Sequence, residues 1–252
     1  MAMCGQLKNQ MEQDRASLHF NSTATLPAAD RYMVTYYTDP LCCWSWAFEK
    51  HWRKFYNTFA DMFSFRYVMA GMLPNWHTFE DPINNVTRPV HFGALGMHVT
   101  SVTQTAINDS VWFNDPPASS YPACMAVSCA ALQSFEAADV YLTKLREAIM
   151  VHGLNISKNE VLLDLARQTA SEHPQLFDYV IFLSQWKSNA PREAFKKDLQ
   201  LISLCKIGRF PTITLTDQAG RGIIMPGYRP YEALLSSLEY FFQQQHINQK
   251  AN

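Results

Sequence analysis

A strand pattern gives way to a helical pattern at Asp39-Pro40-Leu41-Cys42-Cys43-Trp44-Ser45-Trp46. Residues 31–38, just before it, are rich in tyrosine, valine and threonine, which predicts a β-strand. From Pro40 onward the apolar side chains recur at helical spacing, as Phe48, Trp52, Phe55 and Phe59. Cys42 is therefore expected where a helix begins. The unpaired N–H groups and the dipole of a helix start favour a thiolate, so we expect an activated thiol.

The flanking segments predict strands on both sides of a long helical region. Residues 62–69 alternate in polarity and predict a second strand, which completes a β-α-β unit with parallel strands. Residues 75–120 are the least regular, with scattered prolines and glycines. Helices are predicted after them at 122–134, 136–152, 174–186 and 191–206. Another helix is predicted to open with a capping box at Ser157–Glu160 and to run to about residue 169.

The strand signal returns near the C-terminus. Residues 211–216 alternate, 217–220 form a turn, 221–225 pair back as a hairpin, and a last helix opens at Pro230. The order is β-α-β, several helices, then β-β-α. We expect an N-terminal extension at 1–30, a sheet domain made of 31–73 and 207–245, and an all-helical insertion at 74–206.

Two motifs within this order resemble those of a known family. Asp39-Pro40-Leu41-Cys42-Cys43-Trp44-Ser45-Trp46 is similar to the cytosolic DsbA-like pattern Asp-Pro-x-Cys-x-x-Cys-Trp. Gly208-Arg209-Phe210-Pro211-Thr212 resembles the segment that carries the cis-proline of the thioredoxin fold. The resemblance covers about 31–245 and points to the branch of FrnE-type oxidoreductases and YjbH adaptors. It implies an α/β thioredoxin fold of the DsbA-like type with a helical insertion.

The chain departs from the family pattern at Ser45, where the second cysteine of the motif would stand. Dithiol exchange needs that second thiol to release a mixed disulfide, and a serine cannot do this. Cys43 is a possible accessory thiol, although a disulfide between adjacent residues strains the peptide bond between them. An external thiol such as glutathione is the other way to resolve the mixed disulfide. Kappa-class glutathione transferases and 2-hydroxychromene-carboxylate isomerases resemble the chain in fold and commonly carry Ser-x-x-Ser-Trp at this helix start. The motif from Cys42 to Trp46 falls between that pattern and the DsbA-like one.

The resemblance implies a cytosolic thiol-disulfide oxidoreductase acting through one cysteine in a Cys-x-x-Ser motif. Cys42 would be the nucleophile, and Ser45 would donate a hydrogen bond to its thiolate. Phe210, Pro211 and Thr212 would position the substrate backbone. Trp44 is expected to be exposed and to line a substrate groove, with Trp46 buried.

Two further functions remain open at this stage. In the first, Cys42 is vestigial and the chain is a non-catalytic, YjbH-like adaptor for a client protein. In the second, the chain is a kappa-type transferase or isomerase that binds glutathione. The expected partners are therefore protein thiols, glutathione or a client protein. No cofactor is required, and glutathione would act as a co-substrate.

Composition sets limits on the class of protein. The chain has 21 basic and 22 acidic residues and a formal charge of −1, which predicts neither nucleic-acid nor membrane binding. It contains no run of eighteen apolar residues, and residues 1–30 lack the apolar core of a signal peptide. A reducing cytoplasm is therefore expected, with six cysteines present as thiols. The eight histidines show no metal-ligand spacing, so no metal site is predicted.

Overall fold

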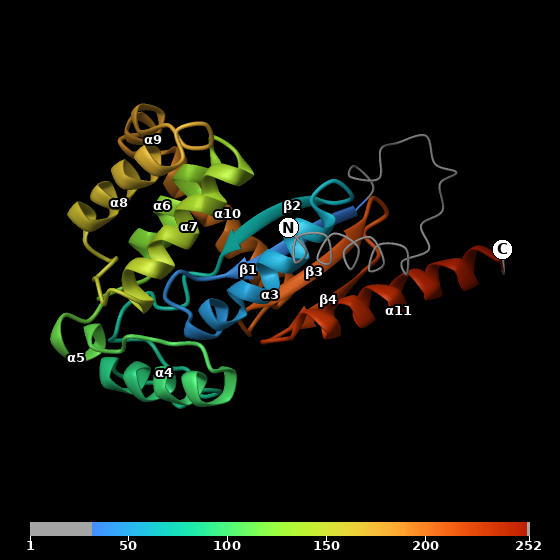
Figure 1. Cartoon of the computed structure of the whole chain (residues 1–252), viewed down its shortest axis with the longest axis horizontal. Coiled ribbons are helices and arrows are strands. Elements are labelled where there is room, and N and C mark those ends of the chain that lie inside the picture. The colour runs from blue at the N-terminus through green and yellow to red at the C-terminus, as the bar shows by residue number, and fades with distance from the viewer. Residues whose placement is uncertain (1–31, 251–252) are drawn as a thin grey trace, which may run out of the picture. The chain divides into compact units, whose positions relative to one another are not determined.

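The structure is a computed structural model that describes residues 32–250, with side chains up to residue 245 (Figure 1). The predicted extension at 1–30 lies outside the described residues. The first half of the strand framework is β1 (Tyr32–Thr38), α3 (Cys43–Phe59) and β2 (Ser64–Met69). The second half is β3 (Thr212–Asp217), β4 (Gly222–Pro226) and α11 (Tyr231–Lys250). This is the β-α-β and β-β-α order that the sequence predicts.

The segment between the two halves is helical. Its helices are α4 (Pro89–Thr103), α5 (Val111–Asn114), α6 (Tyr121–Ala131), α7 (Phe135–Met150), α8 (Asn159–Glu172), α9 (Tyr179–Trp186) and α10 (Ala190–Cys205). The predictions from residue 122 to 206 each correspond to one of these, from α6 to α10. The prolines at positions 122 and 191 lie in the first turns of α6 and α10, where a missing N–H leaves no hydrogen bond unmade.

The four strands form one sheet in the order β2-β1-β3-β4. The hairpin predicted from the turn at 217–220 is confirmed, because β3 and β4 pair antiparallel from Thr212 opposite Pro226 to Thr216 opposite Gly222. A Cβ atom on Gly222 would lie 2.1 Å from the carbonyl oxygen of Leu215. The hairpin therefore needs a glycine at this position. In this order β2 and β4 are the two edge strands.

Two compact units divide the chain. In the described part, one unit comprises 32–36, 48–66 and 212–250, and the other comprises 37–47 and 67–211. Both the Cys42 motif and Pro211 belong to the second unit, together with the helices α4 to α10. The domain boundaries expected near residues 74 and 206 stay a prediction.

The predicted apolar stripe of α3 is the core of the first unit. Phe48, Trp52, Phe55 and Phe59 are each at most 1% exposed. The Trp52 ring lies against Tyr36 of β1, with ring centroids 4.6 Å apart, and stacks on Phe55 at 6.0 Å. Burying a side chain of this size stabilises the fold by about 1.5–3 kcal/mol, so this stripe fixes α3 against the sheet.

Several local predictions are wrong. The helix α3 begins at Cys43 rather than at Pro40, and Pro40 lies in the preceding turn. The capping box at the start of α8 does not form, because the Ser157 hydroxyl donates to Asn155 Oδ1 at 2.6 Å instead. α9 begins at Tyr179, because Asp178 accepts hydrogen bonds from two backbone N–H groups of its first turn and caps it there.

The helix α4 lies in the segment where the sequence shows no clear periodicity. Its fifteen residues contain no Asp, Glu, Lys or Arg, so it has no polar stripe to contrast with the buried one. Phe92, Leu95 and Val99 are buried, whereas Val90 and Met97 are exposed. A helix is recognised as amphipathic from the difference in polarity between its two faces, and in α4 that difference is small.

Candidate functional site

The Cys42 motif is held by a turn that Asp39 organises. The N–H of Leu41 donates to Asp39 Oδ1 at 2.9 Å, and the N–H of Cys42 donates to the Asp39 carbonyl at 3.1 Å. The N–H of Trp46 then donates to the Cys42 carbonyl at 3.0 Å, which is the first hydrogen bond of α3. Cys42 is therefore the residue that directly precedes the helix.

The structure brings Cys42 to the segment that carries Pro211. The peptide bond between Phe210 and Pro211 is cis. The Cys42 thiol donates to the Phe210 carbonyl, with sulfur and oxygen 3.7 Å apart. Cys42 and Phe210, which the sequence assigns to one site, are thus in contact within the second unit. Thr212 is buried at the start of β3.

The surroundings of Cys42 act on its ionisation in both directions. Its side chain is 5% exposed, and burial raises the pKa of the thiol above its ordinary value. The charge of Asp39 raises the pKa further. The hydroxyl and the N–H of Ser45, which are placed to donate to a thiolate sulfur, and the charge of Arg146 lower it only in part. A thiolate here would lose its water, and the helix start does not make up for that loss. The helix start alone therefore does not favour the thiolate in this buried setting, and an activated thiolate stays a prediction.

Ser45, in the position of the family's second cysteine, is completely buried. Its Oγ makes no hydrogen bond within the described part of the chain. The hydroxyl nevertheless acts to lower the pKa of Cys42, because it is placed to donate to a thiolate sulfur. With the thiol protonated, the hydroxyl is left as an unsatisfied buried group.

Asp39 is a buried carboxyl that links three parts of the second unit. Besides its bond to Leu41, its Oδ2 accepts hydrogen bonds from the N–H of Met72 at 2.8 Å and from the Cys124 thiol at 3.4 Å. Burial raises the pKa of Asp39, and these hydrogen bonds offset the rise only partly. Asp39 fixes the motif to the loop after β2 and to α6.

Arg146 on α7 is a functional candidate that sequence reasoning missed. It is completely buried, donates to Thr38 Oγ1 at the end of β1, and places a positive charge near Cys42. Leu142 and Ile149, four residues before it and three after it, are buried core residues of the same helix. A charged residue within an apolar stripe of α7 is the signal that could have found it.

The two tryptophans of the motif are both half-buried, which corrects the expectation of one exposed and one buried. The indole N–H of Trp44 donates to Asn84 Oδ1 at 3.4 Å, and its ring lies edge-on to His98 of α4 at 5.9 Å. The indole N–H of Trp46 donates to the carbonyl of Ala106 at 3.1 Å. The motif therefore binds the segments on both sides of α4.

Among the cysteines that the structure describes, none forms a disulfide with Cys42. Burial and the neighbouring Cys42 raise the pKa of Cys43 well above its ordinary value, so this thiol is a poor nucleophile. Cys124 and Cys129 are buried, as the sequence predicts, whereas Cys205 is exposed and not part of the core. Each of these cysteines is a free thiol.

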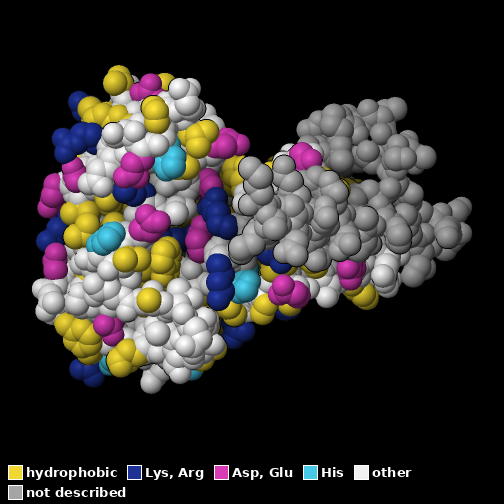
Figure 2. All heavy atoms as spheres, viewed as in Figure 1, with side chains coloured by type: hydrophobic (Ala, Val, Ile, Leu, Met, Phe, Trp, Pro, Cys, Tyr) yellow, Lys and Arg dark blue, Asp and Glu magenta, His cyan; other side chains and the backbone are white. Residues whose placement is uncertain are grey.

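The described part of the chain shows neither a metal-binding cluster nor a membrane-spanning helix. Among the side chains described, from residue 32 to 245, no group of three or more His, Cys, Asp or Glu is arranged to hold a metal ion. No helix in this range combines the length and the apolar character needed to cross a bilayer. Acidic and basic side chains are interspersed over the coloured face in Figure 2.

Comparison with known proteins places this geometry in a family. A family model described as "Thioredoxin" matches residues 36–236. The chain belongs to this thioredoxin family. Among curated proteins, the ClpXP adapter protein SpxH of Halalkalibacterium halodurans is 26% identical over 205 residues, which is 81% of this chain. The match spans only 65% of that relative's own length.

Two solved structures share the fold of this chain. A protein from Nitrosomonas europaea, provisionally described as a protein disulfide isomerase, superposes with a TM-score of 0.69 and 18% identity, covering 86% of this chain and 99% of that one. The cytosolic disulfide reductase DsbM from Pseudomonas aeruginosa superposes with a TM-score of 0.58 and 16% identity, covering 87% and 100%. The predicted DsbA-like thioredoxin fold with a helical insertion is confirmed. The chain is thus a DsbA-like member of the thioredoxin family.

Proposed function

We propose that this thioredoxin-family chain is a non-catalytic adaptor that binds a client protein and presents it to a protease. The observation that carries the proposal is the state of Cys42. Its sulfur is buried, its proton is engaged with the Phe210 carbonyl, and its pKa is raised. The position that would hold a resolving thiol is Ser45. Exchange chemistry needs an accessible thiolate and a second thiol, and this motif supplies neither.

The relatives support the same choice. The curated SpxH proteins that match the chain are named as ClpXP adapters. The alternative reading drawn from the sequence, a YjbH-like adaptor, therefore fits better than its leading one. We place the adaptor in a reducing cytoplasm, where its thiols would stay free.

The test compares binding and chemistry in the same protein. The full chain and its Cys42→Ala variant are used to capture proteins from the source cells, and each captured protein is purified and offered to ClpXP with ATP. An adaptor predicts that the same client is captured by both forms and is degraded faster when either is added. Loss of capture in Cys42→Ala, or glutathione-dependent reduction of insulin by the wild type alone, would contradict the proposal.

A second candidate function is monothiol exchange with glutathione. The unsatisfied Ser45 hydroxyl favours it, because this group is placed to donate to a Cys42 thiolate once one forms. Intact-mass analysis after incubation with oxidised glutathione checks it, with Cys42→Ala as the control. A glutathione adduct on the wild type that forms within minutes near neutral pH would favour exchange. No adduct on the folded chain would exclude it.

A kappa-type transferase would instead bind glutathione without a covalent bond. Calorimetric titration of glutathione into a Cys42→Ser variant separates the two, because only the transferase reading expects binding to survive this substitution. If neither the wild type nor Cys42→Ser shows a heat of binding with glutathione, the adaptor function is the one that stands.

A further inference from the structure

The strand β4 is an edge strand that carries no charged side chain from Gly222 to Pro226. No strand in residues 32–250 pairs with the edge of β4 that faces away from β3. Proteins usually protect such an edge with charges, bulges or a covering segment, because its N–H and C=O groups can pair with another chain. Within the described residues, the main chain at this edge is therefore left without a neighbouring strand, and a partner could pair with it.

The register shows which groups face outward. The N–H of Asp217 donates to the carbonyl of Arg221 at 2.8 Å, so these two residues form a hydrogen-bonded pair. Hydrogen-bonded and non-bonded pairs alternate along an antiparallel ladder, so Ile223 bonds inward to β3. The N–H and C=O of Gly222 and Ile224 consequently face outward. Ile224 is 58% exposed.

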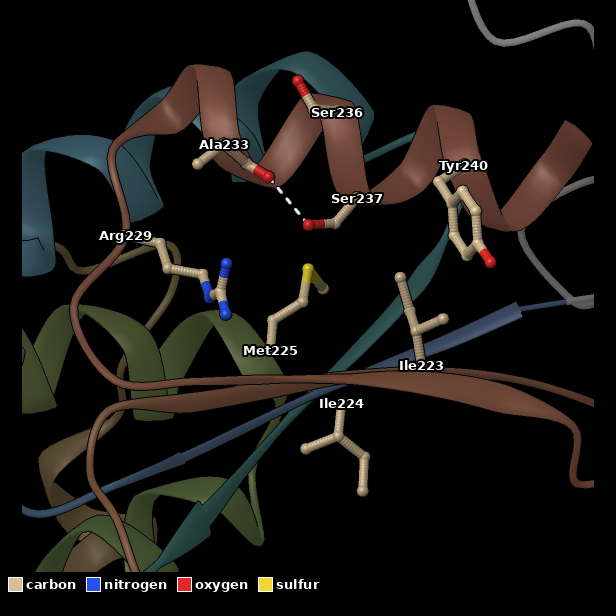
Figure 3. A pocket seen from close by; sticks show the side chains of 8 residues that line it. All are labelled: Ile223, Ile224, Met225, Arg229, Ala233, Ser236, Ser237 and Tyr240. Carbon is tan, nitrogen blue, oxygen red and sulfur yellow. Dashed lines mark hydrogen bonds between the residues drawn. The ribbon is translucent and has the colours of Figure 1, made fainter.

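An open pocket lies between this strand and α11. Its volume is about 530 Å³, and its lining includes Ile223, Met225, Arg229, Ser237 and Tyr240. Figure 3 shows Ile223 and Met225 pointing toward α11, whereas Ile224 points to the opposite face of the sheet. A strand added beside β4 would therefore find apolar side chains on both of its faces.

The pocket has a charged end at Arg229. The Nε of this residue donates to the carbonyl of Pro226 at 3.4 Å. Among the described residues, Arg229 forms no ion pair with a carboxylate. Pro226 has no N–H and its carbonyl is already engaged, so outward pairing ends there. A partner would therefore meet a positive charge beside the end of the open edge.

We propose that the edge of β4 binds an extended segment of the client protein. The segment adds one strand to the sheet through the N–H and C=O of Ile224. It places apolar side chains in the pocket and an acidic side chain on Arg229. This inference rests on the proposed adaptor function and names the surface and the kind of segment that it uses.

Two substitutions isolate the two interactions. Ile224→Pro removes the outward N–H and leaves the ladder to β3 intact, because that N–H does not bond inward; Ile224→Val is its matched control. Arg229→Gln removes the charge, and Arg229→Lys keeps it. Thermal unfolding of all four full-length variants establishes that each is folded before binding is compared.

The probe is a random library of peptides of about ten residues, long enough to span a strand of this length. The wild-type chain is expected to select peptides that alternate apolar and polar residues and carry an acidic residue near one end. Binding of a selected peptide should weaken about tenfold in Ile224→Pro and in Arg229→Gln, and stay near the wild-type value in the two controls. Failure to select peptides, or equal binding by all variants, overturns the inference.

Other occupants of the edge give different results. If the Ile224 amide is already protected from hydrogen exchange in the free monomer, another part of the same chain occupies the edge. If Ile224→Pro dissociates a dimer seen by sedimentation, the occupant is a second copy. Either outcome overturns the client-segment inference. A client that is still captured equally by wild type and Ile224→Pro would overturn this inference alone and leave the adaptor function standing.

Discussion

The thiol of Cys124 donates a hydrogen bond to Oδ2 of Asp39, with sulfur and oxygen 3.4 Å apart. Both groups are buried, and the same carboxylate oxygen also accepts the N–H of Met72. The acid that organises the Cys42 turn therefore also ties it to α6. This single carboxyl accepts hydrogen bonds from the N–H groups of Leu41 and Met72 and from the Cys124 thiol.

Replacing Asp39 with asparagine should destabilise the fold, because the new NH₂ group faces either Met72 N–H or Leu41 N–H and leaves a buried donor unmatched. The expected loss is about 1–3 kcal/mol, measured by urea unfolding. Asp164→Asn is the control, since its ion pair with Arg167 is exposed and should contribute at most about 1 kcal/mol. An Asp39→Asn loss no larger than that of the control would show that the carboxylate is not the organising acceptor.

Ser45→Ala should raise the stability of the chain by about 1 kcal/mol, because it removes a buried hydroxyl without a hydrogen bond. Ser120→Ala is the matched comparison and should lower stability by a similar amount, since its buried Oγ accepts the N–H of Leu73 at 3.1 Å. Opposite signs in thermal or urea unfolding are expected for the two variants. A loss of stability in Ser45→Ala would mean that its hydroxyl is bonded in solution.

The charges around Cys42 should move its pKa in opposite directions. Asp39→Asn removes a charge that raises the pKa of the thiol, so the pKa should fall. Arg146→Gln removes a charge that lowers it, so the pKa should rise. Ultraviolet thiolate absorption, taken as a difference from Cys42→Ala in the same background, measures both. Equal pKa values in the two variants would show that neither charge acts on the sulfur.

His51 should make stability depend on pH. Its Nδ1 accepts the N–H of Tyr231 at the start of α11, and its Nε2 lies 2.9 Å from the Tyr228 hydroxyl. Burial lowers the pKa of His51 below its ordinary value of 6.5, so the unfolded chain takes up a proton more readily than the folded one. Stability should therefore hold above pH 6.5 and fall as the pH drops below it.

Urea unfolding at a series of pH values, compared with His51→Asn, isolates this contribution. The difference in the free energy of unfolding between the wild type and His51→Asn should stay constant above pH 6.5 and change below it. A difference that changes only at alkaline pH would contradict the assigned direction.

The sequence predicted a helix correctly where a stripe of apolar residues lay beside a stripe of polar ones. The stripe from Phe48 to Phe59 predicted α3 and its core, and the turn at 217–220 predicted the β3–β4 hairpin. The sequence did not predict α4, because this helix is apolar on both faces. Boundaries moved where a side chain made an unforeseen bond, as Asp178 did at α9.

The site was predictable in its composition but not in its electrostatics. The motif and Pro211 were expected together, and Cys42 does contact Phe210. The degree of burial around Cys42 depends on the packing of distant helices, which one local pattern cannot report. Arg146 lies more than a hundred residues away in the chain, and only the folded α7 brings its charge near the thiol.

The bonds from Trp44 to Asn84 and from Trp46 to Ala106 bracket α4 at both of its flanks. A segment fixed at its two ends has little conformational entropy to gain from detaching at only one of them. Opening of α4 should therefore be cooperative, with amides across 84–106 exchanging with solvent at one common rate. The two tryptophans of the Cys42 motif would then hold α4 against the start of α3, which gives the motif a structural role separate from any chemistry of its thiol.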